Sequence, residues 1–242
     1  QVWAVGWADD GTAERVEVGS APAWSVVTWA EGDDGELYVP GWSIQRMVAA
    51  DTSGEGFPQT LGATGCFDPA DPTVPVAGLL PYDVSAPLYS DGAGKTRWMA
   101  LPDGTTASID EEGHWDLPVG SVLVKHFERD GQRLETRLLM RHDDGDWGGY
   151  AYRWREDGSD ADLVLGGATV GTSGEPWLIP STGQCRQCHT EAAGQTLGTT
   201  TAQLNRDHDF ELGRANQIAT FDHIGLLDPS PGDPAALDAH PP

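Results

Sequence analysis

The chain has 242 residues, enough for one large domain or two smaller ones, and a formal net charge of −24 at neutral pH. A chain this acidic repels nucleic acid and anionic membrane surfaces, so we expect no nucleic-acid partner. No apolar run approaches membrane-spanning length, so we also expect no membrane span. The acidity is typical of a soluble surface adapted to salty water, with docking of a basic partner or binding of Ca²⁺ as alternatives.

Residues 1–50 alternate between apolar and polar positions like β-strands. In SVVTWAEGDDGELYV, residues 25–39, two apolar runs flank an acidic glycine turn, which predicts a β-hairpin. The stretch resembles the final blade of the β-propeller in sugar-dehydrogenase-like proteins, where a GEDGELYV run precedes a glycine, isoleucine and arginine pattern. Residues 32–39 match the run, and Gly41, Ile44 and Arg46 match the pattern. One blade cannot bury its own face, so the resemblance implies further blades upstream of Gln1; an ordinary meander packed on the rest of the chain is the alternative.

Residues 51–80 are rich in Pro, Gly and Asp without periodicity, which predicts a linker. Strand patterns return from residue 81. In SVLVKHFE one face carries Val122, Val124 and His126, and in RLETRLLMRH one face carries Leu134, Leu138, Met140 and His142. The turn Asp130-Gly131 joins these two strands, and GDWGGYAYRWRE adds another. The region 81–230 is therefore expected to be a β-rich domain built on an antiparallel sheet or sandwich.

After Pro180 the composition shifts toward Ala, Leu and Gln, which predicts short helices. The apolar positions that suggest them are Leu204, Phe210, Leu212, Ile218, Phe221 and Ile224. The expected fold class is thus mainly β, with a small helical cap that carries the cysteine motif described next. Residues 231–242 are expected to form a flexible tail.

Cys185, Cys188 and His189 form a CxxCH run, the pattern that attaches haem c. Each thiol adds to one vinyl group of the porphyrin, and the adjacent histidine coordinates the iron through Nε2. The chemistry needs these three residues at this spacing and in this order. The sequence therefore predicts one covalently bound haem c with His189 as the proximal iron ligand.

Three other readings of the cysteine pair compete. A zinc site would need a second pair of ligands at knuckle-like spacing, which the sequence lacks. A disulfide between Cys185 and Cys188 would suit a secreted protein, and a thioredoxin-type redox pair would need a preceding βαβ unit. Cys66, the third cysteine, is expected to be a buried or paired thiol.

Beyond the motif, four segments resemble a family of bacterial exported proteins with a β-rich region followed by one CxxCH site. They are LLPYDVSAPLYSDGAGKTRWMALPDG, LPVGSVLVKHFE, RLETRLLMRHDDGDWGGYAYRWREDGSDADLVL and WLIPSTGQCRQCHTEAAGQTLGTTTAQLNRD. Members often lie C-terminal to a sugar-dehydrogenase-like propeller or beside further cytochrome c domains. The resemblance spans residues 57–228 and implies a periplasmic, extracellular or cell-surface location. Only Cys185, Cys188 and His189 carry over as site residues.

The sixth iron ligand is not settled by the motif, because no methionine follows residue 140. Met140 and His126 are the leading candidates, although each also suits a buried strand position. His142, His208 and His223 are further candidates, and an open position is an alternative. A thioether ligand would raise the iron potential and a second imidazole would lower it.

The expected function is an electron-transfer module of the cytochrome c type rather than a catalyst on its own. Its partner would be a redox protein or an upstream propeller dehydrogenase domain. The alternatives are the electron outlet of a larger quinone-cofactor sugar or alcohol dehydrogenase and a structural haem module among other haem modules. Ca²⁺ is a weaker expectation at two acidic turns, residues 33–36 and 143–146.

Overall fold

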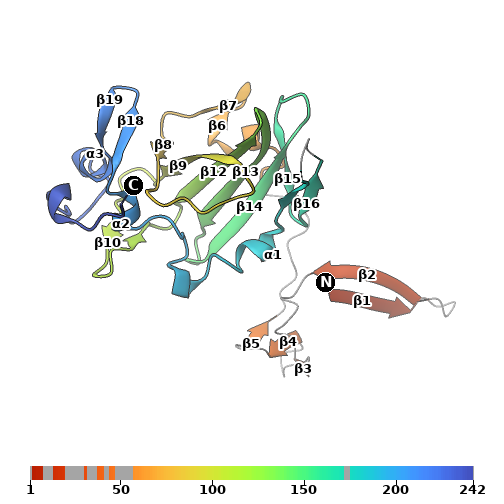
Figure 1. The fold of residues 1–242 in the computed structure, drawn as a ribbon. Helices are drawn as coiled ribbons and strands as arrows, with labels where there is room; N and C mark the ends of the chain where they lie inside the picture. Colours follow the sequence, from red (N-terminus) through yellow and green to blue (C-terminus); the bar gives the residue numbers. More distant parts are fainter. Residues whose placement is uncertain are drawn as a thin grey trace. The chain divides into compact units, whose positions relative to one another are not determined.

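A computed structural model describes residues 2–7, 13–19, 30–31, 37–40, 44–46, 57–171 and 175–241 (Figure 1). The chain divides into two units, Gln1–Phe57 and Pro58–Pro242. Each unit is described by itself.

The first unit consists, in its described part, of two small antiparallel sheets. Strands β1 (Val2–Trp7) and β2 (Ala13–Gly19) form a hairpin. Strands β3 (Ala30–Glu31), β4 (Leu37–Pro40) and β5 (Ile44–Arg46) form a three-stranded sheet. Because Ala30 pairs with Tyr38 and Glu31 with Leu37, the predicted hairpin is confirmed in its backbone. Its acidic turn, one of the two Ca²⁺ candidates, lies outside the described residues.

The second unit is built on a six-stranded antiparallel sheet, so the prediction of a mainly β fold is confirmed. The spatial order is β15-β14-β13-β12-β9-β8. The strands are β8 (Leu80–Tyr82), β9 (Gly94–Ala100), β12 (Val122–Arg129), β13 (Gln132–Arg141), β14 (Trp147–Trp154) and β15 (Ala161–Val164). The turn between β12 and β13 has φ values of 55° at Asp130 and 76° at Gly131, as a tight hairpin turn requires.

Four small hairpins and six short helical segments surround the sheet in the described part of the second unit. The hairpins are β6 (Phe67–Asp68) with β7 (Asp71–Pro75), β10 (Ser108–Ile109) with β11 (Trp115–Asp116), β16 (Ala168–Val170) with β17 (Trp177–Ile179), and β18 (Asp207–Phe210) with β19 (Gly213–Asn216). The helical segments are η1 (Leu61–Thr64), α1 (Thr182–Cys185), η2 (Glu191–Ala193), α2 (Thr201–Leu204), α3 (Gln217–His223) and, near the C-terminus, η3 (Pro234–Ala236). No helix in the described segments has the length and apolar character needed to cross a membrane.

One face of the large sheet, here called the Trp98 face, is closed by aromatic packing. The register places Trp98, Val124 and Leu138 side by side on it. Phe67 of β6 meets Trp98 edge to face, with ring centroids 5.9 Å apart. Tyr152, fully buried on the same face, donates a hydrogen bond to the Pro58 carbonyl at 2.9 Å. Segments that precede the sheet in the chain therefore cover this face.

The other face, here called the Lys125 face, carries two separate apolar clusters. The first joins the sheet to α2 and α3 and includes Met99, Leu123, Leu139, Leu204, Ile218 and Phe221. The second joins it to the β16–β17 hairpin and includes Phe127, Leu134, Ala151, Trp177 and Ile179. Strand alternation puts Lys125 between Leu123 and Phe127 on this face, so charged side chains lie between the two clusters.

The structure changes the expectations for the linker and the tail. From Pro58 onward the predicted linker belongs to the second unit, where Leu61 and Phe67 are buried. The predicted tail packs against α2: the Asn205 side chain donates to the carbonyls of Pro234 and Leu237, and the His240 amide donates to Ala202.

The structure does not show a helical cap that carries the cysteine motif. Helix α1 has one turn, ends at Cys185 and packs beside β14, whereas α2 and α3 lie near β8 at the opposite edge of the sheet (Figure 1). The apolar spacing that suggested a cap belongs instead to separate short elements. Phe210 lies in strand β18, and Leu212 is fully exposed at the tip of the β18–β19 hairpin.

Candidate functional site

The cysteine motif forms one helical turn with its own capping. The Ser181 hydroxyl accepts a hydrogen bond from the Gln184 amide, and the Gln184 side chain accepts one from the Ser181 amide. These reciprocal bonds start the helix at Thr182. The turn continues past α1, because the amides of Cys188 and His189 donate to the Cys185 carbonyl at 3.3 and 3.0 Å. Residues three and four apart on such a turn are neighbours on one face, which brings both thiols and the imidazole to the same side.

A glycine in the sheet lets this turn approach the strands closely. A Cβ atom at Gly149 on β14 would lie 2.6 Å from Cys185 Cβ and 2.8 Å from its Sγ. Gly149 pairs with Leu139, so the contact is on the Lys125 face. Only a residue without a side chain allows the motif to rest on the sheet at this point.

His189 is held in the tautomer that an iron ligand needs. Its Nδ1 lies 2.6 Å from the Gln195 carbonyl oxygen, and a carbonyl only accepts, so Nδ1 carries the proton. Burial lowers the pKa of His189, with smaller contributions from Lys125 and Arg137, and this favours the neutral ring. The lone pair of Nε2 is therefore available for coordination.

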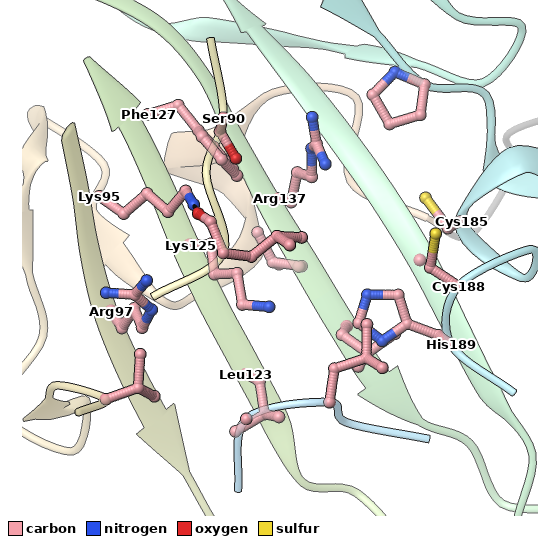
Figure 2. Close-up of a pocket in the computed structure, with 18 of the residues that line it drawn as sticks. Ser90, Lys95, Arg97, Leu123, Lys125, Phe127, Arg137, Cys185, Cys188 and His189 are labelled. Atoms are coloured by element: carbon pink, nitrogen blue, oxygen red, sulfur yellow. Dashed lines mark hydrogen bonds between the residues drawn. The ribbon is translucent and has the colours of Figure 1, made fainter. Parts of the chain in front are cut away.

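The motif lines a cavity of about 280 Å³ on the Lys125 face. This volume is close to the lower end of the range for small-molecule and cofactor pockets, about 300–1,000 Å³. Figure 2 shows Cys185, Cys188 and His189 on one side of the cavity. Its apolar walls come from Val84, Leu88, Leu123, Phe127, Leu139 and Leu197.

Four cationic side chains line the same cavity; in Figure 2, Lys95 and Arg97 lie across from the cysteines, and Lys125 and Arg137 lie between. Lys95 and Arg97 come from β9, Lys125 from β12 and Arg137 from β13, and the register aligns them on one face. These include both lysines of a chain whose net charge is −24. The cavity is thus locally basic in a protein that is otherwise strongly acidic.

The two arginines of this group already have carboxylate partners. Arg97 lies 3.6 Å from Asp83. The Arg137 guanidinium donates to Glu135, whose side chain is fully buried, through Nε at 2.9 Å. It also stacks 4.5 Å from the centre of the Phe127 ring.

The two lysines have no carboxylate partner among the residues that the structure describes. Lys95 donates to the Leu88 carbonyl. For Lys125 the described residues supply neither a hydrogen bond nor an ion pair. Burial lowers the pKa of Lys125 to about 8, and Arg97, Arg137 and Lys95 add to the shift.

The two leading candidates for the sixth ligand, His126 and Met140, lie on the Trp98 face, opposite to the face that carries the cavity. His126 bonds Thr136 through Nδ1 at 2.9 Å and meets the Trp154 ring edge to face. Met140 pairs with Val122 on the same Trp98 face. Alternation along the strands therefore points both side chains away from the cavity.

The three further candidate histidines do not line the cavity. His142 bonds the Tyr150 hydroxyl at 2.9 Å, His208 lies 3.3 Å from Asp83, and His223 ends α3. Of the described cavity-lining residues, none is a methionine and His189 is the one histidine.

The described residues give no support to a zinc site, a Ca²⁺ site or a disulfide between Cys185 and Cys188. Within the described ranges no three His, Cys, Asp or Glu side chains form a group that could hold a metal ion. The acidic turn at 143–146 closes the β13–β14 hairpin, where the Gly145 amide bonds His142 and the Asp146 amide bonds Asp144. Cys185 and Cys188 are free thiols. Cys66 is also free, bonds the Thr64 hydroxyl through its amide, and has a pKa raised by burial.

Sequence reasoning missed the four cations, Gly149 and the Gln195 carbonyl. One signal was present: Lys125 interrupts the apolar positions of a strand, and the chain has one other lysine. The remaining contacts join residues that are distant in sequence, and no local pattern marks them.

No family model, curated protein or solved structure matches the chain. The resemblance to exported proteins with one CxxCH site therefore stays a prediction from the quoted segments.

Proposed function

We propose that the second unit is a c-type cytochrome module that holds one haem through Cys185 and Cys188, with His189 as the proximal iron ligand. The observation that carries the proposal is the tautomer of His189: its Nδ1–H is taken by the Gln195 carbonyl, which leaves Nε2 free beside two free thiols. When bound, a haem supplies one-electron chemistry at its iron.

The residues of the site fit a haem in their chemistry. Cys185 and Cys188 are not joined in a disulfide, and attachment of their thiols would need no oxidant: in each case sulfur bonds one vinyl carbon and the thiol hydrogen goes to the other. Leu123, Phe127 and Leu139 offer an apolar wall that excludes water from a porphyrin. The cations offer partners for its carboxylates.

The proposal includes export and electron transfer. The attachment motif and the quoted resemblance support a periplasmic, extracellular or cell-surface location, with a redox protein as partner. The acidity of the chain supports a basic docking partner. The blade-like pattern around β3–β5 favours one further candidate function, the electron outlet of a quinone-cofactor dehydrogenase whose propeller lies on the same polypeptide.

Covalent attachment is the test of this function. The chain is exported in a bacterium that has the c-type haem attachment machinery, and its intact mass is measured under denaturing conditions. We expect the mass to rise by one haem, and a reduced-minus-oxidised spectrum to show the bands of a c-type haem. A Cys185→Ser/Cys188→Ser variant should lose the added mass, while the matched control Cys66→Ser keeps it. Colourless wild-type protein of unmodified mass would refute the proposal.

A further inference from the structure

The charges that line the cavity are unbalanced. Asp83 and Glu135 neutralise Arg97 and Arg137, whereas Lys95 and Lys125 have no carboxylate among the described residues. Two ammonium groups that are held together in a partly dry cavity repel each other and cost stability unless anions join them. The arrangement thus fits a ligand with two negative charges.

Lys95 lies across the cavity from the cysteines, and Lys125 and Arg137 lie between them (Figure 2). Helix α1, with Cys185, packs on β14, while Lys95 lies on β9 and Lys125 on β12. Three strand spacings separate β14 from β9, which is about 14 Å. In a haem the two vinyl groups and the two propionates are likewise on opposite edges of the macrocycle.

The geometry points to Lys95 and Lys125 as the partners of the two haem propionates, an inference that rests on the proposed function. Two ammonium groups without a carboxylate partner would meet two carboxylates, and the cysteines would hold the opposite edge. Charge-assisted hydrogen bonds of this kind are stronger than neutral ones. The lysines would bind and orient the haem, and the two propionates would balance the surplus positive charge that the lysines bring to the cavity.

The contribution of the haem carboxylates to binding can be measured by comparing two porphyrins. The full chain is produced in the cytoplasm, without haem attachment, and titrated with haem and with haem dimethyl ester, which lacks both negative charges. We expect the diacid to bind at least about 100-fold more tightly than the diester. Lys95→Gln and Lys125→Gln should each reduce this ratio about tenfold, since a hydrogen bond to a charged group contributes about 1.5–3 kcal/mol.

Two variants serve as controls. Arg214→Gln removes an exposed cation on β19, where Arg214 pairs with Asp207 and Asp209, and should leave the ratio unchanged. Lys125→Arg keeps the charge and should retain most of the preference. The inference is overturned if both lysine variants keep the wild-type ratio, or if Arg214→Gln lowers it equally, because a long-range effect of net charge would then be sufficient.

The haem-loaded chain gives an independent measurement. Haem labelled with ¹³C at its carboxyl carbons lets the propionate stretching bands be identified in the infrared difference spectrum. Lys95→Gln and Lys125→Gln should each shift one of these bands while the haem stays covalently attached. If Lys125→Gln instead changes the ligand-field bands of the iron and leaves the propionate bands in place, Lys125 is an iron ligand and its assignment here is wrong.

The two proposals fail in different ways. Wild-type chain that is exported without a covalent haem refutes the proposed function, whatever its preference for the diacid. Wild-type chain that carries haem but shows no dependence on Lys95 or Lys125 refutes this inference alone.

Discussion

The two faces of the large sheet are built from the same strands and have opposite characters. The Trp98 face is closed by Phe67 and by the Tyr152 hydrogen bond, so little of it is left to bind anything. The Lys125 face has apolar clusters at two ends and charged side chains between them. Strand alternation thus gives one sheet a closed face and a second face on which a cavity lies between two apolar clusters.

The largest expected effect is on the closed face. Phe67→Ala removes a buried ring that packs against Trp98, and we expect the free energy of unfolding to fall by about 3–5 kcal/mol. Urea denaturation measures this loss. Leu88→Ala, at a side chain that is 79% exposed, is the control and should change stability by less than about 0.5 kcal/mol. An equal loss in both variants would mean that the closed face does not dominate stability.

On the open face, removing a charge should stabilise the haem-free chain. Lys125 has a pKa of about 8 in the fold and about 10.4 when unfolded, so its ammonium form is disfavoured by folding. Lys125→Met should raise the free energy of unfolding at pH 7 by about 3 kcal/mol.

The stability difference between the wild type and Lys125→Met should depend on pH. Between pH 8 and about 10.4 the unfolded chain binds the extra proton, so the wild type gains stability as pH rises and the advantage of Lys125→Met shrinks to nothing. Unfolding curves at several pH values, compared between the two chains, test it. A constant difference across this range would contradict the prediction.

The neighbouring residue on the closed face should respond in acid. Burial lowers the pKa of His126 to about 4, below the unfolded value of about 6.5. As pH falls from 6.5 to 4 the unfolded chain binds the proton first, so the wild type should lose about 2–3 kcal/mol. His126→Gln, which retains a hydrogen-bonding group for Thr136, should remove this part of the acid profile. Lys125→Met is the matched control and should leave it in place.

The smallest expected change in stability comes from two adjacent glycines that face opposite ways. Gly149→Ala would drive a methyl group into Cys185, and Gly148→Ala would press one against His142 and Tyr150. Each should cost about 1–3 kcal/mol through overpacking. Gly149→Ala alone should reduce the yield of covalent haem, measured as the haem-bearing fraction in intact mass. Equal yields would show that the motif does not depend on its close approach to β14.

The sequence predicted structure well where a local pattern is compatible with a single structure. Asp130-Gly131 between alternating runs predicted the β12–β13 hairpin, and the spacing of Cys185, Cys188 and His189 predicted a haem motif, which remains untested. It failed where short apolar spacings suit several structures. Phe210 and Leu212 suggested a helix but belong to the β18–β19 hairpin, because elements of four residues show no full period.

The sequence could not show which face of the sheet lies against the cysteine motif. Met140 and His126 were reasonable ligands by type, but strand alternation and the position of α1 on β14 direct them away. The basic cavity also depends on register between β9, β12 and β13, which long-range pairing determines. In the sequence, the one sign of this basic cavity was that Lys125 stands between Leu123 and Phe127 on one face of a predicted strand.

The amide of Asn205 has a consequence for protein engineering. Its nitrogen donates to the carbonyls of Pro234, Leu237 and Asp238, and its oxygen accepts from Asn216. Truncation before Pro234 would strip three acceptors from one half-buried group and loosen the junction between α2 and α3. Affinity tags and fused domains should therefore be joined after His240, where the last of these anchoring contacts has been made.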